Sequence, residues 1–407
     1  MAFANSLICR ECSQTYELSP TYFCEACFGP LEVAYDTEAM AASVSAEKIA
    51  AGPPTLWRYA DLLPVEPTAA SDLGAGLTPM IRADRLASEL GLGELWIKND
   101  SLNPTNSFKD RPVTVAVAMA LEFGLKTVAC ASTGNLANSV AAHAAHAGLE
   151  SFVFVPADIE PSKIVATAAL GTVVKVDGNY DAVNRLCSQL NEEYTWGIVN
   201  VNLRPYYAEG SKTLAFETAE QLGWELPDHV VVPVASGALL TKIAKGFREL
   251  AEVGLVSAGK TVTISGAQAE GCSPVAVAFE EGEEDVRPQK PSTIAKSLAI
   301  GDPADGYYAL REVRSSGGAV SAVADSEIVD AIRLLARTEG IFTEPAGGVT
   351  IATLAKLARE GLISPSERVV AYVTGHGLKA PEVMAPDGLD VIAATVTGFQ
   401  DRYETKE

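Results

Sequence analysis

Beyond residue 95, short runs of β-branched and other apolar residues alternate with longer, alanine-rich segments whose apolar positions recur at helical spacing. Strands that alternate with helices in this way indicate an α/β fold whose parallel sheets are covered on both faces. There are too many strands for one compact small domain, so we expect two α/β lobes with a cleft between them. The predicted strands are Leu95–Lys98, Thr127–Ala131, Ser151–Val155, Thr172–Val176, Gly197–Val201, His229–Val234, Thr261–Gln268 and Arg368–Thr374. The predicted helices include Asn135–Ala147, Tyr180–Glu193, Lys212–Leu222 and Leu239–Leu250.

The N-terminal residues follow a different pattern, in which cysteines are the prominent feature. Cys9, Cys12, Cys24 and Cys27 have the spacing C-x2-C-x11-C-x2-C, and two such knuckles can place four thiolates around one zinc ion. A redox pair and a site that has lost its metal are the alternatives. We expect a small zinc-ribbon-like segment with a structural zinc, followed over residues 37–80 by a connector rich in Ala, Pro and Gly.

Composition and charge limit the partners of the protein. Of the 407 residues, 48% are hydrophobic and 20% are charged, which is typical of a globular chain of about two or three domains. Asp plus Glu (52) outnumber Lys plus Arg (31), and the net charge of −21 argues against nucleic acid and membrane surfaces as partners. The sequence has no run of 18 apolar residues and no recognisable secretory signal, so we expect a cytoplasmic protein.

Lys109 is the first candidate catalytic residue along the chain. In the motif Ser101–Arg111 it follows a run of small hydroxyl and amide residues, sits beside Phe108 and comes just before an apolar helix. A lysine becomes a Schiff-base nucleophile when burial or a neighbouring cation destabilises its ammonium group, and Arg111 is a neighbouring cation in the sequence. From these residues alone, a solvated lysine at a helix start is the simpler interpretation.

Further turns at predicted strand ends offer sites for anions. Ser132 and Thr133 precede a predicted helix, whose free amides and positive dipole end can hold a carboxylate or a phosphate. Ordinary capping of that helix explains the presence of these two residues equally well. The turn Val234–Leu239 consists of small residues that let the backbone approach an anion, although a tight turn capped by Ser236 is the simpler interpretation. The turn Val373–Gly377 follows an apolar strand, at a sheet edge where open α/β folds bind ligands.

Taken together and in this order, the motifs resemble those of threonine synthases, which are pyridoxal phosphate enzymes of the tryptophan-synthase-β-like fold (PLP fold type II). The resemblance covers most of the chain after residue 75 and runs through LNPTNSFKDR, ASTGNLANS, EGSKTLAFE, IAKSLAIGDPADG, LARTEGIFTEPAGG and YVTGHGLK. Some members of the family also carry a zinc-ribbon-like segment. The resemblance implies such a segment at residues 1–36, a larger α/β lobe formed by residues 37–105 and 205–407, and a smaller lobe at residues 106–204.

The resemblance also implies how pyridoxal 5′-phosphate is bound. Lys109 matches the lysine that holds the cofactor covalently, and Asn135 matches the asparagine that hydrogen-bonds the pyridoxal hydroxyl. Thr374 matches the hydroxyl residue that faces the pyridine nitrogen. The loop whose amides hold the cofactor phosphate corresponds to Ala235, Ser236, Gly237, Ala238 and Leu239, which have fewer glycines than is common in the family.

The implied reaction converts O-phospho-L-homoserine and water to L-threonine and phosphate. Ser132 and Thr133 lie where the family binds the substrate carboxylate. Because the chain is so acidic, a dianionic substrate needs local positive charge, and we expect it from Arg204, just past a predicted strand, and from Lys212, at a helix start. An ion pair of Arg204 with Glu209 and an exposed Lys212 are the corresponding alternatives.

Other functions share parts of this pattern. A serine/threonine dehydratase, or a β-replacement enzyme such as cysteate synthase, would carry the same lysine and asparagine motifs. A zinc-ribbon binding protein with an inactive α/β body is the alternative from a different class. We expect a threonine synthase that acts on a small-molecule substrate as a homodimer.

Overall fold

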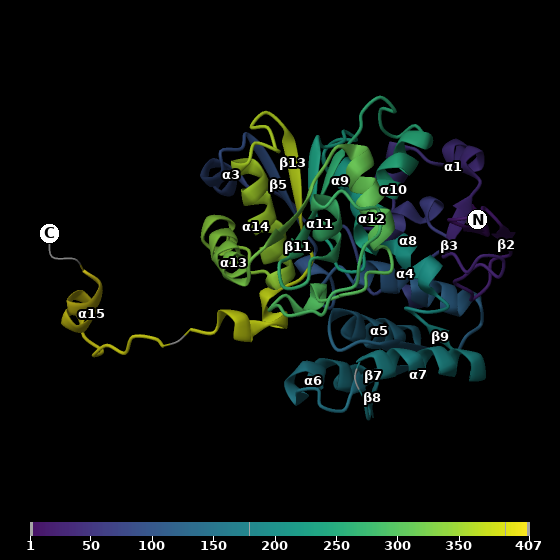
Figure 1. Cartoon of the computed structure of the whole chain (residues 1–407), viewed down its shortest axis with the longest axis horizontal. Coiled ribbons are helices and arrows are strands. Elements are labelled where there is room, and N and C mark those ends of the chain that lie inside the picture. Colours follow the sequence, from purple (N-terminus) through teal and green to yellow (C-terminus); the bar gives the residue numbers. More distant parts are fainter. Residues whose placement is uncertain (1–2, 179, 387, 405–407) are drawn as a thin grey trace.

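The computed structural model describes residues 3–178, 180–386 and 388–404. Its N-terminal segment is a three-stranded antiparallel sheet in the order β2-β1-β3, made of Ala4–Cys9 (β1), Thr15–Tyr16 (β2) and Leu31–Tyr35 (β3). The connector contains α1 (Thr37–Ser43), α2 (Ala46–Ala50) and the 3-10 helices η1 (Leu56–Leu62) and η2 (Ala69–Ser71). Figure 1 shows this segment in purple, packed against one side of the body.

The larger lobe is built on a six-stranded sheet in the order β12-β11-β10-β13-β5-β4. Neighbouring strands are parallel, except that the edge strand β4 runs antiparallel to β5. Every residue of the central strand β10 is buried, as expected in a parallel sheet covered on both faces. The strands are β4 (Met80–Arg82), β5 (Glu94–Asn99), β10 (His229–Pro233), β11 (Thr263–Ala269), β12 (Val320–Val323) and β13 (Arg368–Val373).

Helices cover both faces of this sheet. One apolar cluster joins the sheet to α3 (Asp84–Leu90), α13 (Asp325–Glu339) and α14 (Pro345–Arg359). A second cluster joins the other face to α9 (Thr213–Gln221), α10 (Ala238–Glu252), α11 (Pro274–Glu280) and α12 (Gly306–Ser316). Short 3-10 turns lie at η3 (Asp100–Leu102), η4 (Lys296–Leu298), η5 (Gly377–Lys379) and η6 (Pro381–Met384).

The smaller lobe has a four-stranded parallel sheet in the order β8-β7-β6-β9. Its strands are β6 (Thr127–Ala131), β7 (Glu150–Pro156), β8 (Thr172–Val176) and β9 (Gly197–Ile198). Its helices are α5 (Asn135–Ala147), α6 (Pro161–Leu170) and α7 (Tyr180–Glu193), which lie with this sheet in the lower part of Figure 1. The helices α4 (Asp110–Glu122) and α8 (Arg204–Gly210) connect the two lobes and pack against each other.

The predicted two-lobe α/β architecture is confirmed, and most predicted elements lie within two residues of the observed ones. The strand predicted at Gly197–Val201 is shorter than expected, because the Val201 amide turns back to the Ile198 carbonyl oxygen (2.9 Å) before α8 begins. Within the two lobes, the strands β4 and β12 were not predicted. They are three and four residues long, too short for a clear pattern of apolar positions.

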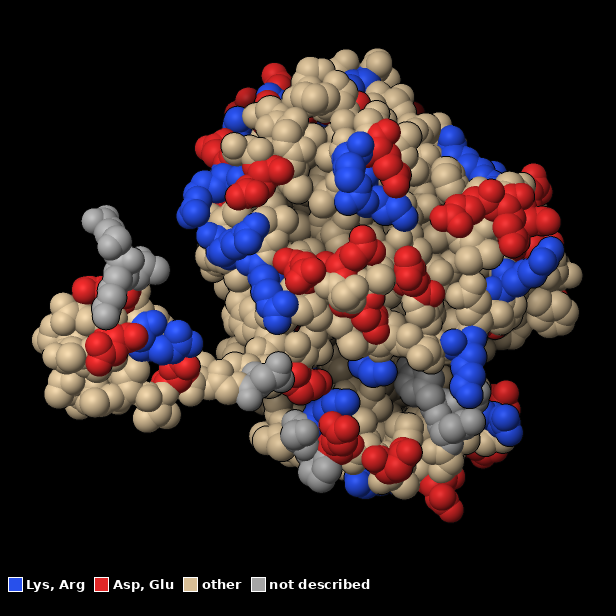
Figure 2. All heavy atoms as spheres, turned by 60° about the vertical axis from the view of Figure 1, so that its left-hand side comes forward, with Lys and Arg blue, Asp and Glu red and all other residues tan. Residues whose placement is uncertain are grey.

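The C-terminal helix α15 (Val396–Tyr403) lies apart from the body at the end of an extended segment (Figures 1 and 2). Within the described ranges, no helix combines the length and the hydropathy needed to cross a membrane.

Candidate active site

The candidate site lies where neighbouring parallel strands of the large sheet end. Strands β10 and β13 are parallel neighbours, so the turn after β10 and Thr374 after β13 lie at the same edge. The loop that leads to Lys109 is attached to this edge: the Phe108 amide donates to the Thr374 carbonyl oxygen at 2.9 Å, and the His376 amide donates to that of Asn106 at 3.0 Å. Figure 2 shows a hollow between the two lobes on the face it displays.

Lys109 occupies the N-cap position of α4 and is half-buried. Its Nζ donates a hydrogen bond to the Tyr207 hydroxyl at 2.8 Å, and it lies 4.7 Å from the ring centroid of Phe108. Lys109 therefore has a neutral partner and aromatic walls, which suit a lysine that must lose its charge to react.

Arg111 does not act as the free neighbouring cation that the sequence suggested. Its guanidinium is fully buried and is bound by Asp100 (2.6 Å) and Glu217 (2.5 Å), so two carboxylates compensate its charge. Lys98 shares Glu217 at 2.7 Å and completes a buried charge network behind α4. This network anchors the start of α4, and thereby the position of Lys109.

Asn135, the first residue of α5, points its amide at a buried carboxylate. Its Nδ2 donates to both oxygens of Glu344, at 2.9 and 3.1 Å, and the Ser297 hydroxyl donates to the same group at 3.3 Å. Burial raises the pKa of Glu344, while Asn135, Lys379, Ser297 and Lys109 act in the opposite direction. The carboxylate fixes the amide orientation and leaves the remaining polar positions of Asn135 for a ligand.

The turn 235–239 leaves its backbone amides free. Within the described part of the chain, none of these amides donates to a protein acceptor, and they stand at the start of the 15-residue helix α10. Gly237 has a φ of +94°, and a Cβ there would lie 2.6 Å from the Asp305 carbonyl oxygen, so the turn requires glycine. Free amides at a helix N-terminus fit a phosphate group, which suits the cofactor phosphate expected here.

Two hydroxyl groups at this edge also fit a bound cofactor. Thr374 as a residue is 3% exposed, and its hydroxyl, which is not completely buried, makes no hydrogen bond within the described residues. Ser107 Oγ, two residues before Lys109, is buried without a hydrogen-bond partner in the same part of the chain. A buried hydroxyl without a partner is costly unless a ligand supplies one, and a pyridine nitrogen is a suitable acceptor.

Ser132 and Thr133 lie in the turn between β6 and α5, directly before Asn135, and are half-buried. The Ser132 hydroxyl accepts a hydrogen bond from the Gly134 amide at 3.3 Å, but Gly134 is itself the N-cap of α5 and no side chain caps this helix, so neither Ser132 nor Thr133 has the capping role that the sequence left open. This bond occupies one acceptor position of the hydroxyl and leaves its proton available to a carboxylate.

The two cations expected at the substrate phosphate have acidic partners. Arg204, whose side chain is 31% exposed, is bound by Asp305 at 2.6 Å rather than by Glu209. Lys212 is fully buried, not exposed at a helix start, and lies 2.7 Å from Glu209 and 2.8 Å from Glu249. These contacts indicate that Lys212 stabilises the fold, and of the two cations only Arg204 lies near the surface.

Sequence reasoning missed Tyr207, Glu344 and Lys379. Lys379 is half-buried on η5, and within the described ranges it forms no ion pair. Burial lowers its pKa, while the nearby carboxylates of Glu344 and Asp110 act in the opposite direction. A buried acid before a proline at a helix start resembles an ordinary cap, so the local sequence gives no signal for Glu344.

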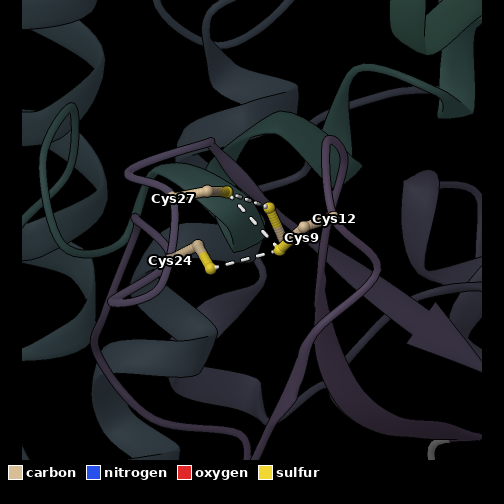
Figure 3. Close-up of side chains that lie close together, drawn as sticks. All are labelled: Cys9, Cys12, Cys24 and Cys27. Atoms are coloured by element: carbon tan, nitrogen blue, oxygen red, sulfur yellow. Dashed lines mark hydrogen bonds between the residues drawn. The ribbon is translucent and has the colours of Figure 1, made fainter.

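The four N-terminal cysteines converge at one point (Figure 3). Their Sγ atoms all lie within 4.8 Å of one another, with separations of 3.5 Å for Cys9–Cys27, 3.6 Å for Cys12–Cys24 and 3.4 Å for Cys12–Cys27. Sulfurs bound tetrahedrally to zinc at about 2.3 Å are separated by about 3.8 Å. The cluster fits one zinc ion with little rearrangement.

Comparisons with known proteins agree with this geometry. The family of pyridoxal-phosphate dependent enzymes matches residues 72–375. The threonine synthase of Methanocaldococcus jannaschii is 41% identical over 92% of this chain and 93% of that protein, and the threonine synthase of Methanosarcina acetivorans is 40% identical over 93% of both. Among solved structures, O-ureido-L-serine synthase matches 79% of this chain and 97% of that protein with a TM-score of 0.64 at 22% identity.

A second solved structure shows the same fold. Threonine deaminase isoform 2 of Solanum lycopersicum matches 75% of this chain and 82% of that protein with a TM-score of 0.63 at 24% identity. These structures support the predicted PLP fold type II, and the sequence relatives support the predicted cofactor. The chain therefore belongs to the threonine synthase family of pyridoxal-phosphate-dependent enzymes.

Proposed function

We propose that the protein converts O-phospho-L-homoserine and water to L-threonine and phosphate. The observation that carries the proposal is that Lys109, Thr374 and the free amides of residues 235–239 belong to one edge of the large sheet, in a chain whose relatives are threonine synthases. Asn135 of the smaller lobe is joined to the same edge through Glu344, whose amide donates to the Gly375 carbonyl oxygen at 3.1 Å. When bound, pyridoxal phosphate supplies an electron sink for the substrate carbons.

The chain's own residues have distinct roles in this proposal. Lys109 holds the cofactor covalently, and its amine, once freed, moves protons at the α and β carbons of the substrate. The Tyr207 hydroxyl orients that amine, as its 2.8 Å contact with Nζ indicates. Asn135, fixed by Glu344, hydrogen-bonds the pyridoxal hydroxyl.

The remaining polar groups hold anions and tune the ring. The amides of residues 235–239 bind the cofactor phosphate. The neutral Thr374 hydroxyl faces the pyridine nitrogen without giving it a full positive charge. Ser132 and Thr133 bind the substrate carboxylate, and Arg204, the more exposed of the two expected cations, remains a candidate for the substrate phosphate.

The test is product analysis. The purified enzyme is incubated with phosphohomoserine, threonine, serine or phosphoserine, and inorganic phosphate, ammonia and threonine are measured. Release of phosphate with stoichiometric threonine from phosphohomoserine supports the proposal. Rapid ammonia release from threonine or serine, without threonine synthesis, would instead identify a dehydratase.

Lys109→Ala provides the internal check on the site. We expect this variant to lose both turnover and the visible absorption band of the bound cofactor, because no other lysine of the described residues donates to the Tyr207 hydroxyl. Lys126→Ala, which removes an exposed lysine outside the site, is the matched control and should retain both. Normal colour and turnover in Lys109→Ala would show that the assignment is wrong.

We also propose that residues 37–105 and 205–407 form the larger lobe and residues 106–204 the smaller one, and that both follow the N-terminal segment 1–36. The enzyme is, in this proposal, a cytoplasmic homodimer. The two separate sheets support the division into lobes. Limited proteolysis tests the boundaries, and light scattering of the purified protein tests the dimer.

A further inference from the structure

The first cysteine knuckle contacts the large lobe beside the turn 235–239. Arg10, between Cys9 and Cys12, donates through a guanidinium nitrogen to Asp305 Oδ1 at 3.3 Å and stacks over the Tyr308 ring, 3.5 Å from its centroid. The next residue, Glu11, accepts a hydrogen bond from the Tyr308 hydroxyl. Two side chains of one knuckle therefore contact the segment 305–308.

Asp305 in turn braces the turn that we assign to the cofactor phosphate. Its amide donates to the Ser236 carbonyl oxygen at 2.8 Å, and its own carbonyl oxygen would lie 2.6 Å from a Cβ at Gly237. The Asp305 residue is 6% exposed, so its backbone fills the space directly behind the turn. A shift of Asp305 would therefore displace the amides at the start of α10.

The charge of Asp305 needs compensation at this position. A carboxylate behind a phosphate site repels a bound dianion, and the effect is strong because so little water reaches Asp305. Its two oxygens are bound by different arginines, Oδ1 by Arg10 and Oδ2 by Arg204 at 2.6 Å. Arg10 therefore compensates the oxygen that Arg204 does not bind.

The cysteine segment is attached to the same helices along its length. Tyr35 donates to Glu209 on α8 at 2.7 Å, and Lys245 on α10 donates to the Val33 carbonyl oxygen at 3.1 Å. Lys242 on α10 also pairs with Glu32 of β3. The segment is thus fixed to α10, whose first turn carries the free amides, and the four sulfurs of Figure 3 close the knuckle that presents Arg10.

We propose that Arg10 is a positioning residue for the cofactor phosphate, and that metal binding at Cys9, Cys12, Cys24 and Cys27 thereby sets the affinity of the enzyme for pyridoxal phosphate. Arg10 acts through Asp305, by holding it in place and by neutralising its charge. The inference rests on the proposed cofactor role of residues 235–239, and it does not depend on the identity of the substrate.

Titration of the apoprotein with pyridoxal phosphate, followed by absorbance, tests the proposal. Because Arg10→Ala removes a charged hydrogen bond, we expect it to raise the dissociation constant for pyridoxal phosphate about tenfold, and we expect Arg10→Lys to stay closer to wild type. The affinity for pyridoxal, which lacks the phosphate, should not change. Arg248→Ala is the matched control, because Arg248 joins α10 to Glu312 on α12 (2.6 Å) away from the turn.

A double variant gives a second test, which remains informative even if Arg10→Ala alone lowers the stability of the protein. If the Asp305 charge that Arg10 no longer compensates causes the weak binding, adding Asp305→Asn to Arg10→Ala should restore most of the affinity. Removing the metal with a chelator should weaken wild-type binding but add little to Arg10→Ala, because both changes act through the same contact.

Three results would overturn the inference. They are an unchanged dissociation constant in Arg10→Ala, an equal loss of affinity for pyridoxal and for pyridoxal phosphate, and unchanged binding after complete metal removal. None of these measurements uses phosphohomoserine. Failure of the proposed reaction and failure of this inference therefore give different results.

Discussion

Replacement of Lys212 by methionine distinguishes a structural lysine from one that binds substrate. The Lys212 ammonium group is fully buried between Glu209 and Glu249, at 2.7 and 2.8 Å. Methionine keeps an unbranched, adaptable side chain and removes only the charge. We expect Lys212→Met to be less stable than the wild type and to keep its Michaelis constant for phosphohomoserine.

The size of the loss follows from what the two carboxylates retain. Glu209 keeps Lys242 at 2.6 Å and Lys245 at 3.1 Å, so its charge stays compensated. Among the described residues Glu249 keeps only Lys245, at 3.7 Å, and because burial already raises the pKa of Glu249 it can take up a proton in the variant. Breaking a buried ion pair costs about 3–5 kcal/mol, and these remaining partners favour a value of about 3 kcal/mol.

Thermal unfolding of the apoprotein, followed by circular dichroism, measures this loss. At about 2.1 cal/mol/K per residue, 407 residues have an unfolding entropy of about 0.85 kcal/mol/K, so a loss of about 3 kcal/mol lowers Tm by about 3–4 °C. Lys260→Met is the control, because Lys260 forms a single exposed pair with Asp228 (2.7 Å), which is worth under about 1 kcal/mol. An unchanged Tm with a severalfold higher Michaelis constant in Lys212→Met would refute the structural interpretation.

Three further outcomes are expected. Burial alone would raise the pKa of Glu217, but Arg111 and Lys98 hold this pKa at about 2, below the ordinary 4.5. The ionised Glu217 therefore stabilises the fold at neutral pH, and this contribution is lost as the pH falls from about 4.5 towards 2. Glu217→Gln should accordingly flatten the acid side of a plot of Tm against pH. Metal analysis should find about one zinc per chain in protein purified without chelator, and less in Cys24→Ser; absence of zinc and iron from the wild type would count against the site. We propose Lys379, a half-buried cation without an ion pair among the described residues, as a further candidate for the substrate phosphate. Lys379→Met should then raise the Michaelis constant for phosphohomoserine about tenfold while Lys379→Arg stays near wild type, and equal constants in all three proteins would exclude this role.

The strands that position the site were predictable because they are buried on both faces. Strands β10 and β13 have continuous apolar runs, and the turns that follow them contain the small and hydroxyl residues expected at a ligand-binding edge. The edge strand β4 pairs on one side only and is three residues long, so its pattern differs little from that of a loop.

The contacts inside the site were not predictable, because they join distant segments. Tyr207 lies 98 positions after Lys109, and Glu344 lies 209 positions after Asn135. Neither partner has a local pattern that distinguishes it from a packed tyrosine or a helix-capping acid. Only the fold brings these groups together, because it places α8 beside α4 and brings Glu344, before α14, within hydrogen-bond distance of Asn135 at the start of α5.

The outcomes at Arg204, Lys212 and Arg111 have one physical cause. The chain has 52 acidic residues and 31 basic ones, so in the folded state carboxylates are in excess around each cation. A lysine or arginine near a predicted site is then more readily bound by a protein carboxylate than left free for a substrate phosphate, as the pairs with Asp305, Glu209 and Glu217 show.

Lys379 differs because its neighbouring carboxylates already have other partners. Glu344 accepts two hydrogen bonds from Asn135, and Asp110 accepts hydrogen bonds from Thr105 and Ser139. Both acids stay close enough to influence the Lys379 ammonium group without pairing with it. In so acidic a protein, a binding site for a dianion therefore depends on the residues that keep the nearby carboxylates occupied as much as on the cation itself.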